Sequence, residues 1–216
     1  MYETFEKLPE SKRKQIMEAC VSEFARNGYR NASTNAIVNS LGISKGVLFL
    51  YFKSKKNLYL YLIEHYSKIL VEEFFLENNS TSLPAADLFD NLGEFYKKLL
   101  QERPEIFVFL LDAFIYAPSD IREEVEESHN RAHGNVFQYI KKEGFREGVD
   151  LQMVIDMLHM VSFFVGQQIF SDYKDQDLTK AARGDIINNI EKYEDTLSRY
   201  IDIIKYGVYQ TPPEQK

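Results

Sequence analysis

The sequence predicts an all-α fold of about nine helices, in which a three-helix amino-terminal domain precedes a larger helical domain. Two observations favour this fold class. Apolar residues recur at spacings of three and four along most of the chain, the period of an amphipathic helix, and no segment alternates with the period of a strand. With 216 residues, of which 44% are hydrophobic, the chain can bury one large core or two smaller ones.

The first helix is predicted in the stretch KRKQIMEACVSEFARNGY. Its apolar side chains fall on one face, at Ile16, Ala19, Cys20, Phe24 and Ala25. Gly28 then provides a residue that stops a helix. This stretch therefore begins the amino-terminal domain with an amphipathic helix.

Two short helices follow in STNAIVNSLG and ISKGVLFLYF. Hydroxyl and amide side chains open the first of them, and Gly42 can adopt the left-handed conformation that a tight turn needs. Ser44 is suited to cap the second helix, in which Leu48 and Phe52 share a packing face with Ile43. Two short helices joined by a turn of three or four residues that contains Gly predict a helix-turn-helix.

Charge is divided unevenly along the chain. Residues 1–60 carry ten Lys or Arg and five Glu, whereas residues 61–216 carry 16 basic and 28 acidic side chains. Residues 24–63 contain six basic side chains and no acid. A basic module on an acidic body favours local attraction of phosphate, although a charged face in contact with solvent alone is the alternative.

The third helix offers groups that suit a DNA groove. Its first turn has free backbone amides, which favour phosphate. Lys45 can donate to guanine or phosphate, Val47 can contact a thymine methyl, and Tyr51 can hydrogen-bond phosphate. Gly46 permits a close approach of the backbone. These features predict that this helix is presented to double-stranded DNA.

The stretch from Ser33 to Leu58 resembles the DNA-binding domain of TetR-type transcriptional regulators. The matching features, in order, are Ser33-Thr34, Gly42, Ser44-Lys45-Gly46, Tyr51-Phe52, the Lys-rich run 53–56 and Leu58. The resemblance covers about the first sixty residues. Three residues depart from the family pattern, which usually has Ala at Val38, Tyr at Phe49 and a polar or aromatic residue at Leu50. These departures bear on the operator sequence more than on the mode of docking.

The resemblance implies a set of DNA-contacting residues. The set comprises Ser33, Thr34, Ser44, Lys45, Gly46, Val47, Leu50, Tyr51 and Lys55. Phosphate contacts are expected from Ser33, Thr34, Tyr51 and Lys55, and base or groove contacts from Lys45, Gly46, Val47 and Leu50. The alternatives are that Ser33 and Ser44 serve only as helix caps and that Lys53 and Lys56 add only to the field.

The remainder of the chain reads as a helical body. Helices are predicted at residues 54–78, 85–101, 104–117, 119–143, 151–173 and 185–208. The chain is thus expected to comprise a helix-turn-helix DNA-binding domain at 1–53, a helical effector-binding and dimerisation domain at 54–210, and a flexible tail at 211–216.

The last two predicted helices are expected to form a dimer contact. The first of them is apolar nearly all round, and the second carries an apolar stripe. The resemblance implies a four-helix interface between two protomers, matching a palindromic operator. The expected interface residues are Phe163, Phe170, Ile190, Tyr193, Leu197, Tyr200, Ile201 and Ile204. The alternative is that both helices close the core of a monomer.

The middle helices are predicted to enclose a pocket for a small apolar or aromatic effector. They carry more aromatic surface than caps and turns need, although an ordinary core is the alternative. The expected lining residues are Tyr96, Phe107, Phe114, Asn130, His133, Phe137, Met157, Phe163, Phe164 and Gln167. His129 and His133 are four residues apart, but no third ligand accompanies them, so neither a metal nor a cofactor is predicted.

These features together predict a ligand-responsive transcriptional regulator, a repressor rather than an activator, that works as a homodimer. Effector binding is expected to swing the helix at 54–78 and so change the separation of two recognition helices. No catalytic constellation is found, so an enzyme is not predicted. A helical sensor or carrier without DNA binding is the alternative. With one cysteine, no export signal and no membrane span, the chain is expected to be cytoplasmic.

Overall fold

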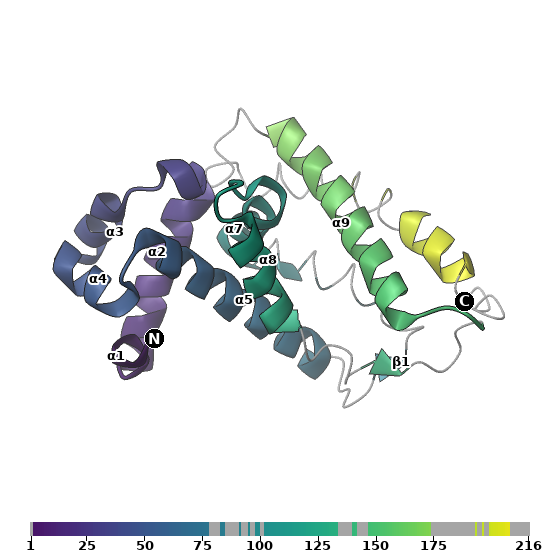
Figure 1. The fold of residues 1–216 in the computed structure, drawn as a ribbon, viewed down its shortest axis with the longest axis horizontal. Helices are drawn as coiled ribbons and strands as arrows, with labels where there is room; N and C mark the ends of the chain where they lie inside the picture. The colour runs from purple at the N-terminus through teal and green to yellow at the C-terminus, as the bar shows by residue number, and fades with distance from the viewer. Residues whose placement is uncertain are drawn as a thin grey trace. The chain divides into compact units, whose positions relative to one another are not determined.

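The structure is a computed structural model, drawn as a ribbon in Figure 1. It describes residues 2–77, 83–84, 91, 95, 98–99, 102–133, 140–141, 147–173, 193, 196 and 199–207. These residues are helical nearly throughout, which confirms the all-α prediction. Within them, the β structure is a parallel pairing of β1 (Leu83–Pro84) with β2 (Ile140–Lys141).

The chain divides into two compact units. The first unit comprises Met1–Ile69 and Pro104–His133, and the second comprises Leu70–Arg103 and Gly134–Lys216. The predicted boundary between residues 53 and 54 stays a prediction. The predicted tail at 211–216 lies outside the described residues.

The first compact unit begins with α1 (Glu3–Glu6) and α2 (Glu10–Asn31). The apolar face of α2 is buried, and it includes Ile16, Cys20 and Phe24. Gly28 has φ 65° and ψ 171°, which breaks the path of α2. Gly28, predicted to end the helix, therefore interrupts α2, which continues to Asn31. Glycine suits this position because it alone adopts this backbone conformation without steric cost.

The helix-turn-helix consists of α3 (Thr34–Leu41) and α4 (Lys45–Phe52), which lie beside each other in Figure 1. The chain bends by 110° between them. Gly42 ends α3 in the left-handed conformation, with φ 63° and ψ 29°. The predicted turn is thus confirmed, and its geometry falls in the range typical of this motif.

An aromatic cluster fixes α4 from its inner side. Leu48 and Phe52 are fully buried. The ring of Phe52 lies 4.7 Å from that of Phe5 in α1 and 5.4 Å from that of Tyr61. Since closely packed rings resist rearrangement, α1 acts as a brace for α4. The sequence did not predict this role for α1.

Three longer helices complete the first compact unit or continue from it. These are α5 (Lys55–Glu77), α7 (Pro104–Tyr116) and α8 (Arg122–His133). α5 contributes residues to both compact units, and α7 packs against α2. The predicted helices at 54–78 and 104–117 are confirmed. The prediction that the next helix runs to residue 143 is wrong, because Ile140 and Lys141 belong to β2.

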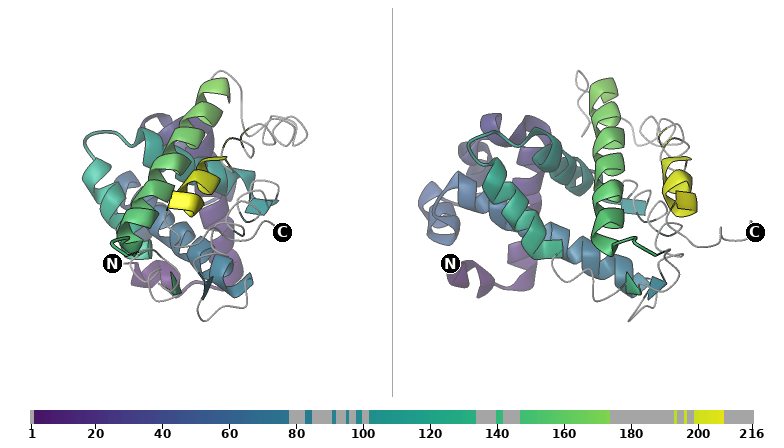
Figure 2. Two further views of the ribbon diagram at one scale, coloured as in Figure 1. Left: turned by 90° about the vertical axis from the view of Figure 1, so that its right-hand side faces the viewer. Right: turned by 45° about the vertical axis from the view of Figure 1, so that its right-hand side comes forward.

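In the second compact unit, α9 (Leu151–Tyr173) confirms the helix predicted at 151–173. Residues 199–207 are helical and lie beside α9 (Figures 1 and 2), and the rings of Phe164 and Tyr200 are 5.9 Å apart. Within the helices predicted at 85–101 and 185–208, the described residues are helical, and the others lie outside the description.

Candidate nucleic-acid interface

Two serines cap the helices of the motif. The Ser33 hydroxyl accepts a hydrogen bond from the Ala36 amide at 3.3 Å, and the Ser44 hydroxyl accepts one from the Val47 amide at 3.3 Å. The capping role given as an alternative for both residues is therefore present. Each hydroxyl keeps its own proton for a second acceptor, so a phosphate contact is compatible with capping.

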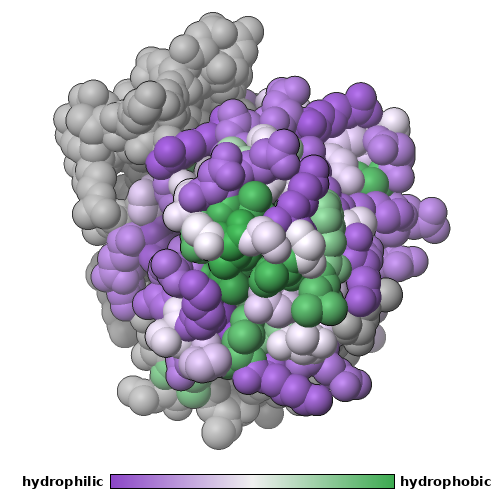
Figure 3. All heavy atoms as spheres, turned by 90° about the vertical axis from the view of Figure 1, so that its left-hand side faces the viewer, coloured by the Kyte–Doolittle hydropathy of each residue, from purple (hydrophilic) through white to green (hydrophobic). Residues whose placement is uncertain are grey.

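The outer side of α4 is open. Lys45, Gly46 and Leu50 are exposed, with Leu50 at 54% of its full accessibility. Val47 and Phe49 are partly exposed, and the Lys45 ammonium lies 5.7 Å from the centre of the Phe49 ring. Figure 3, a view from the side of α3 and α4, shows an apolar area ringed by hydrophilic residues. The first turn of α4 is thus accessible to a large partner.

Gly46 has room for a larger side chain within the protein. A Cβ atom built on Gly46 would meet only the Ser44 hydroxyl, at the ordinary contact distance of 3.7 Å. Its backbone is helical, unlike that of Gly28 and Gly42. The fold therefore does not require glycine at this position.

Of the remaining predicted DNA contacts, Thr34 is partly exposed, and Tyr51 and Lys55 are engaged with the protein. The Tyr51 ring lies 5.7 Å from that of Phe5 and is partly exposed. The Lys55 ammonium donates to the Arg30 carbonyl at 3.0 Å and lies 5.1 Å from the centre of the Tyr29 ring. Burial lowers the pKa of Lys55, and the nearby Glu23 carboxylate opposes this effect.

Half of the basic side chains in the acid-free stretch pair with acids from elsewhere in the first compact unit. The three ion pairs are Arg26–Glu105 at 3.2 Å, Arg30–Asp120 at 3.3 Å and Lys56–Glu124 at 2.9 Å. The hydrogen bond and charge of Glu124 raise the pKa of Lys56. These three cations therefore connect α7, α8 and the turn between them to α2 and α5. Phosphate attraction alone does not explain the absence of acids.

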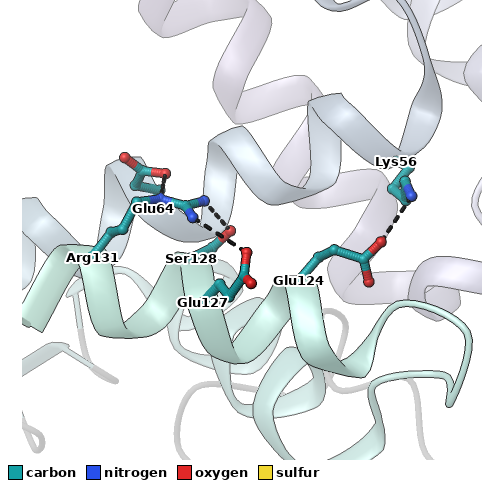
Figure 4. Close-up of polar contacts among 6 residues, drawn as sticks. All are labelled: Lys56, Glu64, Glu124, Glu127, Ser128 and Arg131. Carbon is teal, nitrogen blue, oxygen red and sulfur yellow. Dashed lines mark hydrogen bonds and ion pairs between the residues drawn. The ribbon is translucent and has the colours of Figure 1, made fainter.

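The contact between α8 and α5 is polar (Figure 4). Besides the Lys56–Glu124 pair, the Arg131 guanidinium binds Glu64 of α5 at 2.9 Å. Within α8, Arg131 also donates to the Ser128 hydroxyl at 2.9 Å and lies 3.7 Å from Glu127. Sequence reasoning missed this contact. The acidic run at 123–127, facing the basic start of α5, was the signal that could have revealed it.

Within the described residues, Lys45, Lys53 and Lys55 have no carboxylate at salt-bridge distance. Lys53 follows α4 directly and is exposed. Within the acid-free stretch, the basic side chains without a carboxylate partner therefore lie at the two ends of α4. This placement suits a helix flanked by phosphates.

The predicted effector residues divide between the two compact units. In the first, the Phe114 ring lies edge-on to that of His129 at 4.3 Å, Phe107 is partly buried, and Asn130 is exposed. In the second, Met157, Phe163, Phe164 and Gln167 are exposed on α9. Tyr96, Phe137 and the His133 side chain lie outside the described residues. The pocket stays a prediction.

The predicted dimer residues also separate into two groups. Phe163 and Tyr200 are exposed, whereas Tyr193, Ile201 and Ile204 are almost fully buried within one chain. Ile190, Leu197 and the Phe170 side chain lie outside the described residues. Among the described residues of α9 and the helix at 199–207, the exposed apolar residues that the dimer prediction omitted are Met153, Met157, Met160, Phe164, Ile203 and Tyr206.

Other kinds of site are not evident where the structure describes the chain. No group of three or more His, Cys, Asp or Glu side chains there could hold a metal ion. No single helix in the described ranges is long and apolar enough to cross a membrane. Together α3 and α4 have the required length and apolar composition, but the chain bends by 110° between them.

Residues 16–62 match the family of bacterial regulatory proteins called the tetR family. An uncharacterized HTH-type transcriptional regulator of Bacillus subtilis (strain 168), YuxN, is 25% identical over 128 residues, or 59% of this chain and 43% of that protein. The match thus spans less than half the length of this curated relative.

Two solved structures extend the similarity over most of the fold. A TetR family transcriptional regulator from Chloroflexus aurantiacus J-10-FL aligns with a TM-score of 0.56 and 21% identity, covering 97% of this chain and 98% of that one. The regulator FadR from Bacillus subtilis, in complex with stearoyl-CoA, aligns with a TM-score of 0.60 and 17% identity, covering 86% and 97%. The amino-terminal helix-turn-helix is therefore similar to that of the tetR family over residues 16–62, and the fold is similar to that of these solved structures.

Proposed function

We propose that this chain is a repressor that binds a palindromic operator in double-stranded DNA as a homodimer and is released by a small molecule. The observation that supports this most is the orientation of α4. Its inner side is fixed by the buried Leu48 and Phe52, and its first turn is open. A rigid short helix with an accessible amino-terminal turn fits the major groove.

The proposed DNA contacts are of two kinds: some position the protein on the duplex, and others read the base sequence. Lys55, Tyr51, Thr34 and the two capping serines contact phosphates, while Lys45, Gly46, Val47 and Leu50 face the bases. Phosphate contacts fix the register of a protein on DNA, and base contacts specify the sequence. Lys53 adds to the attraction, because it is exposed and has no carboxylate partner in the described ranges.

The dimer forms through the exposed apolar face of α9 and the helix at 199–207. Val154, Leu158 and Val165 occupy the buried side of α9, while Met153, Met160 and Phe164 occupy the exposed side. A contiguous exposed apolar face on a helix typically marks an interface between proteins. A two-fold axis through it presents two copies of α4 to two half-sites.

The effector is small and apolar or aromatic. This proposal is supported by the aromatic content of the helical body and by the binding of stearoyl-CoA to the FadR relative. Only two residues separate α4 from α5, and α5 contributes to both compact units, so a shift of its second half would be transmitted to α4.

Selection of duplexes from a random pool, followed by titration of the selected sequence, tests the proposal. A palindromic sequence, bound with an affinity that falls steeply with salt, is expected because several phosphates release counterions. Unchanged operator affinity at a saturating concentration of every candidate effector would rule out the switch but not the DNA binding. The alternative, a helical sensor or carrier, predicts no selected sequence and little effect of salt.

A further inference from the structure

The outer side of α4 is apolar for a surface that contacts DNA. Among the eight residues KGVLFLYF, Lys45 is the one charged residue, and no side chain carries an amide, a guanidinium or a carboxylate. Leu50 is the one large aliphatic side chain counted as exposed among the described residues of the first compact unit. Val47, three residues earlier, shares its face and is partly exposed.

This composition limits which bases α4 can read. In the major groove, adenine is recognised by the amides of Asn or Gln, and cytosine by the carboxylates of Asp or Glu. Guanine is recognised by Lys or Arg, and thymine by apolar contact with its C5 methyl group. Of these chemistries, α4 offers only the last two.

We propose that Leu50 and Val47 read the operator through the C5 methyl groups of thymines. Lys45 reads guanine on the adjacent face, where the Phe49 ring restrains its ammonium. Gly46 lies between the two faces and lets the backbone come close to the bases. This inference rests on the proposed operator binding and names the bases that the same helix recognises.

The surroundings of Leu50 favour DNA over another protein as its partner. The apolar area on this side is ringed by hydrophilic residues (Figure 3). Lys45 and Lys53, which have no carboxylate partner in the described ranges, flank it at the two ends of α4. A base edge between two phosphate backbones matches this arrangement, with apolar contact in the middle and cations at the ends.

The test uses the full chain and the operator obtained by selection. Each thymine of one half-site, and then its symmetry mate, is replaced by deoxyuridine, which lacks only the C5 methyl group. Wild-type affinity is expected to fall about fourfold for each contacted methyl, the equivalent of one buried methylene, and about fifteenfold for a symmetric pair. Fluorescence anisotropy at fixed salt measures the change.

Two variants separate the methyl contact from other effects. Leu50→Ala should lose the preference for thymine at the position that Leu50 contacts and keep it at the position that Val47 contacts. Lys45→Ala should weaken binding but keep the fourfold preference for thymine. Both residues are exposed, so neither variant is expected to unfold the domain, and thermal melting checks this.

The outcomes distinguish this inference from the proposed function. A selected palindrome that binds equally with deoxyuridine at every thymine overturns the methyl contact and leaves operator binding intact. Full operator affinity in Leu50→Ala also overturns it and assigns the exposed leucine to a different partner. Failure to select any sequence overturns both proposals.

Discussion

At the residue scale, Asp112 is an acid in an unfavourable place. It lies in the apolar helix α7, and its carboxylate is 3.6 Å from the position that a Cβ on Gly28 would occupy. Burial raises the pKa of Asp112 from 3.8 to about 6. Burial, together with the Asp112 carboxylate, also raises the pKa of Tyr59. The ionised form of Asp112 is therefore disfavoured in the folded state.

This leads to a prediction for Asp112→Asn. As the pH rises from 3.8 to about 6, the unfolded chain releases the Asp112 proton while the folded chain retains it, so the free energy of unfolding falls. Above pH 6 the loss is complete, at most about 3 kcal/mol. The variant should therefore gain stability over the wild type as pH rises from 4 to 7. Urea unfolding of both proteins across this range measures the difference, and a constant difference would contradict the prediction.

Lys53 adopts a strained backbone conformation. Its φ is 65° and its ψ is −41°, and the Ser54 amide donates to the Phe52 carbonyl at 2.7 Å across it. This tight turn ends α4 and allows α5 to begin at Lys55. A side chain in this conformation costs about 1–3 kcal/mol.

We therefore expect Lys53→Gly to stabilise the protein. Relief of strain exceeds the entropy that glycine loses on folding by about 1 kcal/mol, which corresponds to a rise of about 2–4 °C in Tm. Lys53→Ala is the matched control, because it removes the same charge and keeps the strain. Equal melting temperatures for the two variants would refute the assignment of strain.

At the scale of elements, the first turn of α4 is arranged for a partner rather than for the fold. Gly46→Ala should raise the stability of the chain by about 0.5–1 kcal/mol, since alanine favours helices and finds room here. The same methyl group would hold the backbone away from the bases, so operator affinity should fall at least tenfold. Thermal melting and anisotropy titration of one preparation measure both effects. A variant that is more stable and binds normally would show that the backbone does not approach DNA closely.

The sequence predicted most elements and fewer of their contacts. Spacing and caps located α3, α4, α5, α7 and α9 correctly, because these signals are local. The extent of α8 was wrong, since the pairing of Ile140 and Lys141 in β2 depends on a distant segment. The ion pairs from α7 and α8 to the acid-free stretch are also non-local. Periodicity found the stripe of the last helix but could not assign its partner, and the structure buries Ile201 and Ile204 within one chain.

At the scale of the whole molecule, the exposed face of α9 provides a test of assembly. Met160→Lys places a charge on that face, where the wild-type side chain is 65% exposed in a single chain. The variant should be monomeric and should bind a full palindrome no better than a half-site, while its fold is unchanged. Sedimentation and anisotropy measure these properties. Gln152→Lys, an exposed change of equal size and charge on the same helix, should remain dimeric. A dimeric Met160→Lys variant would exclude this face as the interface.

Because Cys20 is buried, its rate of chemical modification can report local opening of the amino-terminal helices. It is the single cysteine, it lies on the inner face of α2 with no exposed surface, and burial raises the pKa of its thiol to about 12. An alkylating reagent can reach the thiolate only when α2 separates from its neighbours. The rate of modification therefore follows the opening of the amino-terminal bundle, and its slowing by operator or effector can be read without an introduced label.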